Sequence, residues 1–372
     1  MLFALFLPSL HLSAQARSKF DTLRAQAEAA RDANRLDEAV GLYQRALAVR
    51  PAWKEGWWSL GTLQYDRSRY AEAKRALQKV VTQDPESGTA RLMLGLSEFE
   101  LGEDGAALHE IERAKKQTLT HDPQMLDVMF FHEGVLLRRS SQFEAAAQVL
   151  QDLCARNPTD SEVVRELGMV ALRLPDKLYP AIDSSTGGVV LPLGEARCRI
   201  AQKKFDAAQQ LAKAAVAQFP QERNVHYAYG RVLLDCNDPL DAVSAFEEEI
   251  RNQPNDVFSR LEIAAAQYRT NSAAGIPYAE EAVRLNPRVP IGHYLLGLLL
   301  VDVGQYEDAV PQLEIASASF TEDSKVYFAL AKAYAHVGRR EDAARSRERF
   351  LRLAEVQDEH PRSHDHMHNS GV

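Results

Sequence analysis

Apolar and polar positions along the chain follow a helical period, with large apolar or small residues recurring three, four and seven positions apart. Trp57, Leu60 and Gly61 show this spacing in the first part of the chain, and Leu330 and Tyr334 show it near the end. No segment shows the two-residue alternation that is typical of a half-buried strand. The pattern therefore predicts an all-α protein.

The helical pattern repeats with a period of about 34 residues, and prolines mark the period. Pro51 and Pro85 lie 34 residues apart, as do Pro220 and Pro254, and Pro287 follows after 33. Each proline stands where a helix is expected to end, because the residue before a proline disfavours the helical conformation. The eighth residue of a window is small and the twentieth is almost always alanine. These pairs are Ala27 with Ala39, Gly61 with Ala73, Gly95 with Ala107, Gly134 with Ala146, Ala196 with Ala208, Gly230 with Ala242, Gly297 with Ala309, and Ala331 with Ala343.

Two antiparallel helices approach closely only where both carry a side chain no larger than a methyl group, so each window predicts a helical hairpin. The combination of Trp57, Leu60 and Gly61 (W-x2-L-G) with Ala73 and Pro85 resembles the tetratricopeptide repeat family. This resemblance implies an all-α solenoid of helical hairpins, a right-handed superhelix of about nine to ten repeats. The repeats are expected to start near residues 20, 54, 88, 127, 189, 223, 257, 290 and 324.

The regular spacing is interrupted in the middle of the chain. A single helix from Ser161 to Leu174 resembles the first half of a further repeat whose second helix is lost. Residues 175–192 (PDKLYPAIDSSTGGVVLP) are rich in proline, glycine and serine, which predicts a loop between two halves of the solenoid; the alternative is a lid over its groove. The expected organisation is a signal segment (1–16), N-terminal repeats (17–174), an insertion (175–192), C-terminal repeats with a capping helix (193–357) and a His-rich disordered tail (358–372).

The N-terminus begins with an apolar stretch from Leu2 to Leu12 that is too short to span a bilayer as a helix. Ala14 and Ala16 have the A-x-A spacing of a signal peptidase site, although no Lys or Arg precedes the apolar stretch. The segment predicts cleavage after Ala16 and export to the periplasm or beyond, with membrane contact only through this transient signal. The alternative is an uncleaved helix that packs on the first repeat of a cytoplasmic adaptor.

Composition excludes several classes of protein. Hydrophobic residues make up 45% of the chain and charged residues 26%, which excludes a disordered or multi-spanning membrane protein. The 44 Lys and Arg residues against 52 Asp and Glu residues give a net charge of -8, which does not favour a nucleic-acid partner. His132 and Glu133 are not followed by the second histidine of a zinc-protease motif, and no phosphate-binding loop occurs. We therefore expect neither an enzyme nor a cofactor.

The family resemblance implies that the first helix of each hairpin lines a concave groove that binds a peptide segment of another protein. Aromatic and arginine residues are enriched in binding hot spots, and arginine can hold a carboxylate through two hydrogen bonds. About half of the inward positions are expected to belong to the core between repeats. The candidate partner-binding residues are Trp58, Tyr65, Phe99, Phe131, Arg138, Arg165, Arg197, Tyr227, Arg231, Tyr268, Tyr294 and Phe328. The carboxylate clamp of chaperone-binding family members is not expected, because Glu28, Trp58 and Thr62 occupy its positions.

Cysteine and histidine leave two questions open. Cys154, Cys198 and Cys236 are spaced unlike metal ligands, which favours three partly buried thiols; a disulfide between Cys198 and Cys236 is the alternative for an exported protein. The C-terminal tail carries alternating imidazoles that are weak candidates for a metal site. They are His360, His364, His366 and His368. A disordered polar tail is favoured over the alternative of an accessory carrier that loads metal there.

Overall fold

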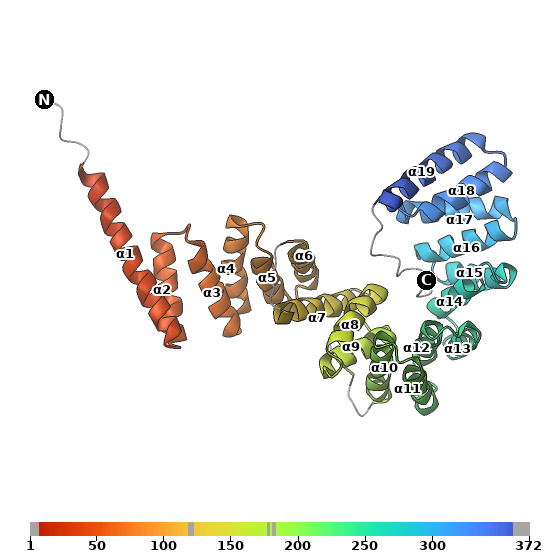
Figure 1. The fold of residues 1–372 in the computed structure, drawn as a ribbon, viewed down its shortest axis with the longest axis horizontal. Helices are drawn as coiled ribbons and strands as arrows, with labels where there is room; N and C mark the ends of the chain where they lie inside the picture. Colours follow the sequence, from red (N-terminus) through yellow and green to blue (C-terminus); the bar gives the residue numbers. More distant parts are fainter. Residues whose placement is uncertain (1–6, 118–122, 177–178, 181–183, 360–372) are drawn as a thin grey trace. The chain divides into compact units, whose positions relative to one another are not determined.

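The computed structural model describes residues 7–117, 123–176, 179–180 and 184–359, which form helices joined by short turns (Figure 1). These residues contain no strand, so the all-α prediction is confirmed. The chain divides into two compact units, Met1–Leu153 and Cys154–Val372. This boundary precedes the predicted insertion at residues 175–192.

Successive helices of the first unit pair into antiparallel hairpins. They are α1 (Leu7–Asp32), α2 (Leu36–Val49), α3 (Lys54–Asp66), α4 (Tyr70–Gln83), α5 (Gly88–Glu100), α6 (Asp104–Lys115) and α7 (Pro123–Arg139), and α8 (Phe143–Arg156) ends just inside the second unit.

The second unit continues the same alternation. Its helices are α9 (Ser161–Ala171), α10 (Ser185–Ala201), α11 (Phe205–Gln218), α12 (Val225–Asp235), α13 (Pro239–Asn252), α14 (Phe258–Gln267), α15 (Ser272–Leu285), α16 (Pro290–Asp302), α17 (Tyr306–Ser319), α18 (Ser324–His336) and α19 (Arg340–Glu359). The repeat starts predicted near 54, 88, 290 and 324 coincide with the first residues of α3, α5, α16 and α18.

Small residues lie where the two helices of a hairpin cross, as the sequence predicts. The Cβ that an alanine at position 61 of α3 would add lies 2.8 Å from Leu77 Cγ of α4, so a larger side chain at Gly61 displaces its neighbour. The alanines at the twentieth position are buried on the second helices. Ala39, Ala73, Ala107, Ala146, Ala208, Ala242 and Ala309 are all 0% exposed.

The carbonyl of the closing proline receives a side-chain hydrogen bond from the next helix. Trp57 Nε1 of α3 donates to the Pro51 carbonyl at 2.8 Å, six residues back. The equivalent contacts join Arg91 to Pro85 (3.0 Å), His226 to Pro220 (3.0 Å), Arg260 to Pro254 (2.7 Å) and His293 to Pro287 (3.0 Å). Carbonyls at a helix end lack a partner within the helix, so this contact supplies one and fixes one hairpin to the next. We call it the proline-carbonyl contact.

The predicted loop at residues 175–192 is wrong over its second half, because α10 begins at Ser185. The described residues between α9 and α10 contain no further helix, and α10 pairs with α11 as the first helix of the next hairpin, so α9 has no second helix of its own, as predicted. Residues 185–192 form the start of α10, which Ser184 caps by accepting a hydrogen bond from the Gly187 N–H at 2.9 Å, and Pro192 lies inside the helix. Burial explains this departure from local propensity, because Val189, Val190 and Leu193 are at most 3% exposed against α9 and α11. Residues 177–178 and 181–183 of the insertion lie outside the described residues.

The two predicted terminal segments are only partly described. Residues 7–16 of the expected signal form the first turns of α1, and residues 1–6 lie outside the described residues. The four histidines of the tail also lie outside them. Among the described helices, none is both long enough and apolar enough to cross a membrane.

Candidate interaction surface

All the candidate residues of the first unit lie on first helices, and most belong to contacts between neighbouring hairpins. Tyr65 of α3 packs edge-on against Tyr70 with ring centroids 5.4 Å apart. Burial, with a contribution from the negative charge of Glu100, raises the pKa of Tyr65 to about 12. Trp58 of α3 is half-buried against a cluster that includes Leu77. These rings support the stacking of α3 on α4 and leave part of their surface to solvent.

Phe99 of α5 and Phe131 of α7 both pack edge-on against His132. The ring centroids of Phe99 and His132 are 4.7 Å apart, and those of Phe131 and His132 are 5.5 Å apart. The Arg139 guanidinium lies 4.6 Å from the Phe99 ring centroid. This cluster of half-buried aromatic and cationic side chains presents first-helix surface from two consecutive hairpins.

The arginines predicted to hold a partner's carboxylates are instead committed within the chain or buried. Arg197 of α10 pairs with Asp235 at 2.5 Å, and Arg231 of α12 pairs with Glu262 at 2.5 Å. Arg138 of α7 is 0% exposed. Each of the three is engaged inside the protein, because a guanidinium removed from water requires a counter-ion or equivalent partner there, and partner binding through them stays a prediction.

Glu262 also explains why Tyr227 is not available to a ligand. Tyr227 is 5% exposed and donates its hydroxyl proton to Glu262 Oε1 at 3.3 Å, while Arg173 Nη1 donates to the Tyr227 hydroxyl at 3.1 Å. The Arg173 guanidinium lies 3.6 Å from the ring centroid of Phe258. Burial lowers the pKa of Arg231, but the neighbouring acidic groups, of which Glu262 contributes most, together outweigh burial and raise that pKa above its ordinary value. The network joins the segment that follows α9 to helices α12 and α14.

Sequence reasoning missed the acidic members of these pairs, although a signal was present. Asp235 follows Arg197 by 38 residues and Glu262 follows Arg231 by 31, each about one repeat later. An arginine on one first helix with an acid about one repeat later on the next first helix indicates an internal ion pair.

The remaining candidates of the second unit lie nearer its surface. Arg165 of α9 lies with its guanidinium 4.9 Å from the ring centroid of Tyr179, and Tyr268 at the end of α14 is half-buried. Tyr294 of α16 is packed 5.3 Å from Phe320, centroid to centroid.

Phe328 of α18 is the most exposed of all the candidates. It is 57% exposed and lies 5.4 Å from Phe350 of α19, centroid to centroid. Leu351 of α19 is 52% exposed. An apolar surface is therefore accessible at the first helix of the last hairpin.

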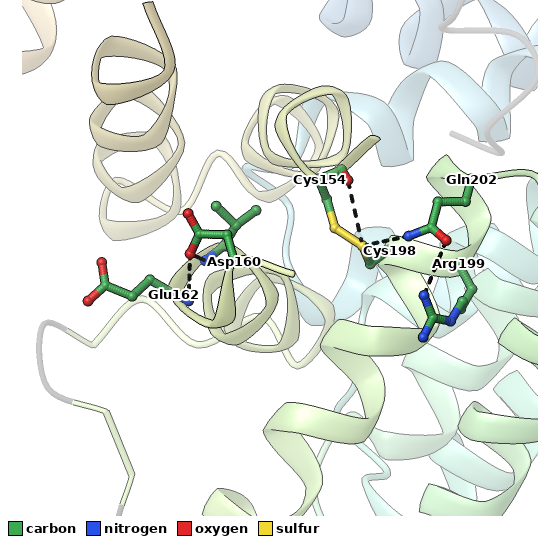
Figure 2. Close-up of a disulfide and its surroundings, with 7 residues drawn as sticks. Cys154, Asp160, Glu162, Cys198, Arg199 and Gln202 are labelled. Atoms are coloured by element: carbon green, nitrogen blue, oxygen red, sulfur yellow. Dashed lines mark hydrogen bonds between the residues drawn. A yellow bond between two sulfur atoms is a disulfide. The ribbon is translucent and has the colours of Figure 1, made fainter. Parts of the chain in front are cut away.

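A disulfide joins Cys154, in the last turn of α8, to Cys198 of α10 (Figure 2). The two Cα atoms are 5.8 Å apart, and both sulfurs belong to side chains that are at most 2% exposed. Cys236 is a free thiol whose pKa is raised by burial. Both cysteine predictions are therefore wrong: Cys198 has Cys154 and not Cys236 as its partner, and only one thiol remains.

Metal-binding chemistry finds no support in the described ranges, where no group of three or more His, Cys, Asp or Glu residues is arranged to hold an ion.

Comparisons with known proteins identify one family. The profile described as "Tetratricopeptide repeat" matches residues 24–73, 59–118, 193–257 and 294–356, which together make up more than half of the chain. The ESX-3 secretion system protein EccA3 of Mycolicibacterium smegmatis (strain ATCC 700084 / mc(2)155) is 30% identical over 145 residues, which are 37% of this chain and 22% of that protein. The chain thus matches about a fifth of the length of that relative.

Solved structures of helical-repeat proteins are similar over parts of the chain. MamA (41-end) from Desulfovibrio magneticus RS-1 is 18% identical with a TM-score of 0.41, covering 49% of this chain and 100% of that one. A tetratricopeptide repeat protein from Parabacteroides merdae ATCC 43184 is 13% identical with a TM-score of 0.36, covering 76% of this chain and 99% of that one.

Proposed function

Because the chain belongs to the tetratricopeptide repeat family, we propose that it is a non-catalytic, exported scaffold that binds peptide segments of a partner protein along its first helices. The family assignment supports the role of a protein-interaction scaffold. The observation that carries the choice of surface is the aromatic side chain Phe328, which stands 57% exposed on the first helix α18. Large exposed aromatic side chains are effective anchors for a partner's apolar residue.

Site-specific photo-crosslinking tests this surface. A photoreactive phenylalanine analogue placed at Phe328 is expected to crosslink a partner protein in the native host. The matched control is the same analogue at Leu240, which is 82% exposed on the second helix α13. Crosslinks to one partner from position 328 and not from position 240 support binding through first helices. In the variant Phe328→Ser, a photoreactive residue placed at a neighbouring position should then capture less of that partner. Equal crosslinking from both positions would contradict the assignment.

The disulfide supports the exported location over the cytoplasmic alternative. Disulfides persist in oxidising compartments and are rare in the cytoplasm, where thiols are kept reduced. Cys154 and Cys198 are paired, which agrees with the A-x-A site at Ala14 and Ala16. Sequencing the N-terminus of the mature protein tests the proposal: export predicts a first residue of Arg17, and a protein that retains its first residues is the result expected of a cytoplasmic adaptor.

A further inference from the structure

A cleft of about 700 Å³ lies in the first unit among α4, α5 and α6. The second helices α4 and α6 form its walls, and α5 contributes the floor. It is therefore a different surface from the first-helix surface that carries Phe328. None of the candidate partner-binding residues lines it.

The floor of the cleft carries charged residues where the preceding repeat has uncharged ones. Arg91 takes the place that Trp57 has 34 residues earlier, and Glu98 takes the place of Gln64. Arg91 pairs with Glu110 at 2.6 Å, and its side chain is 3% exposed. Burial raises the pKa of Glu98, an effect that its ion pair with Lys74 at 3.3 Å opposes. These contacts hold the polar groups of the floor in place.

The rim of the cleft carries cations that the protein does not neutralise. Arg75 and Lys79 of α4 and Arg113 of α6 line the cleft and are exposed, and none of the three forms an ion pair within the described part of the chain. With Arg91 they make four cationic side chains against the two acidic ones, Glu98 and Glu110. This local excess of positive charge contrasts with the net charge of -8 for the whole chain.

We propose that this cleft binds an acidic peptide segment of a partner protein, with the carboxylates of the segment paired to Arg75, Lys79 and Arg113. The apolar contacts that Val81 and Leu94 offer in the same cleft suit a peptide better than a free anion. A nucleic acid is disfavoured because the acidic chain as a whole repels a polyanion, and the positive surface is confined to one cleft.

Fluorescence anisotropy with the full chain tests the proposal. The probe is a fluorescein-labelled peptide of alternating Glu and Ala, and the matched Gln and Ala peptide is the uncharged control. The wild-type chain should bind the acidic peptide and not the control, with an affinity that falls as salt rises. The triple variant Arg75→Glu, Lys79→Glu, Arg113→Glu should bind at least about tenfold more weakly. Its thermal unfolding should stay unchanged, because the three side chains are exposed and form no internal ion pair.

A second triple variant controls for charge alone. Lys19→Glu, Arg24→Glu, Arg45→Glu makes the same charge change at exposed positions of α1 and α2. Retained binding by this variant supports a defined site, whereas equal loss in both variants means long-range attraction and overturns it. Competition experiments with other anions complete the test. Displacement of the peptide by inorganic phosphate identifies a free-anion site, and tighter cleft-dependent binding of a DNA oligonucleotide identifies a nucleic-acid site; either result overturns the proposal.

Discussion

Replacing Gly168 with alanine tests how closely α9 and α10 approach one another. A Cβ added at Gly168 would overlap the carbonyl oxygen of Val190 and lie 2.7 Å from its carbonyl carbon. At Gly61 the added Cβ meets side chains alone, with Leu77 at 2.8 Å and 2.9 Å and Ala76 at 3.5 Å. At Gly41 in α2 it meets nothing within 4 Å. The added methyl group therefore meets backbone at position 168, side chains at position 61 and open space at position 41.

The magnitudes follow from two opposing effects. Glycine to alanine in a helix interior is favourable by about 1 kcal/mol, and this gain is common to all three positions. Gly41→Ala should therefore stabilise the chain by about 0.5–1 kcal/mol. Overpacking costs about 1–3 kcal/mol where side chains must shift, so Gly61→Ala should lie between about neutral and 2 kcal/mol of loss. Gly168→Ala should lose more than about 2 kcal/mol, because two backbones must separate.

Amide hydrogen exchange is the suitable assay, because a repeat protein opens locally and need not unfold in one step. Gly168→Ala should reduce the protection of α9 and α10, while Gly61→Ala should change α3 and α4 only slightly. Urea unfolding followed by circular dichroism gives the summed effect. If the amides of α9 and α10 are as well protected from exchange in Gly168→Ala as in the wild type, the expected backbone overlap is refuted.

The contacts described above lead to further expectations. Cys198→Ser should destabilise the second unit by about 4 kcal/mol, the chain-entropy estimate for a separation of 44 residues. Thiol titration of the unfolded, unreduced wild type should find one thiol, and three after reduction. Trp57→Phe keeps an aromatic ring but removes the donor to the Pro51 carbonyl, so urea unfolding should show a loss of about 1 kcal/mol; an unchanged midpoint would contradict the contribution of that contact. Arg231→Met leaves Glu262 buried without its counter-ion and should lower the free energy of unfolding by about 3–5 kcal/mol. Combining it with Glu262→Leu should recover part of that loss in the same assay. A double variant less stable than the single one would argue against charge burial as the cause.

Periodicity predicts the fold of this chain because each repeat is a local unit, and the residues at which its two helices cross must be small. Gly61 and Ala73 are identifiable from spacing alone, since any larger side chain would separate the two helices. The start of α10 was not predictable in this way. Its glycines and Pro192 disfavour a helix locally, and only burial against neighbouring helices makes them helical.

The candidate surface could be predicted only in part, because burial depends on neighbours in the next repeat. Position along a first helix identifies Phe328 and Arg231 equally well, yet one is exposed and the other is ion-paired with Glu262. The pairing of Cys154 with Cys198 depends on where α8 meets α10, which the irregular segment between them hides in the sequence. The cleft among α4, α5 and α6 could not be predicted, because most of its lining residues lie on second helices, which the family resemblance does not place in the groove.

The proline-carbonyl contact has a consequence for how repeats diverge. Tryptophan, arginine and histidine all serve as its donor in this chain, at Trp57, Arg91 and His226 among others. Volume, aromaticity and charge differ among these residues, and what they share is an N–H at the right reach from the backbone. Substitution of one of these residues by another at this position keeps the hydrogen bond between hairpins. The chemistry of the contact can therefore change during evolution while the packing of neighbouring repeats is retained.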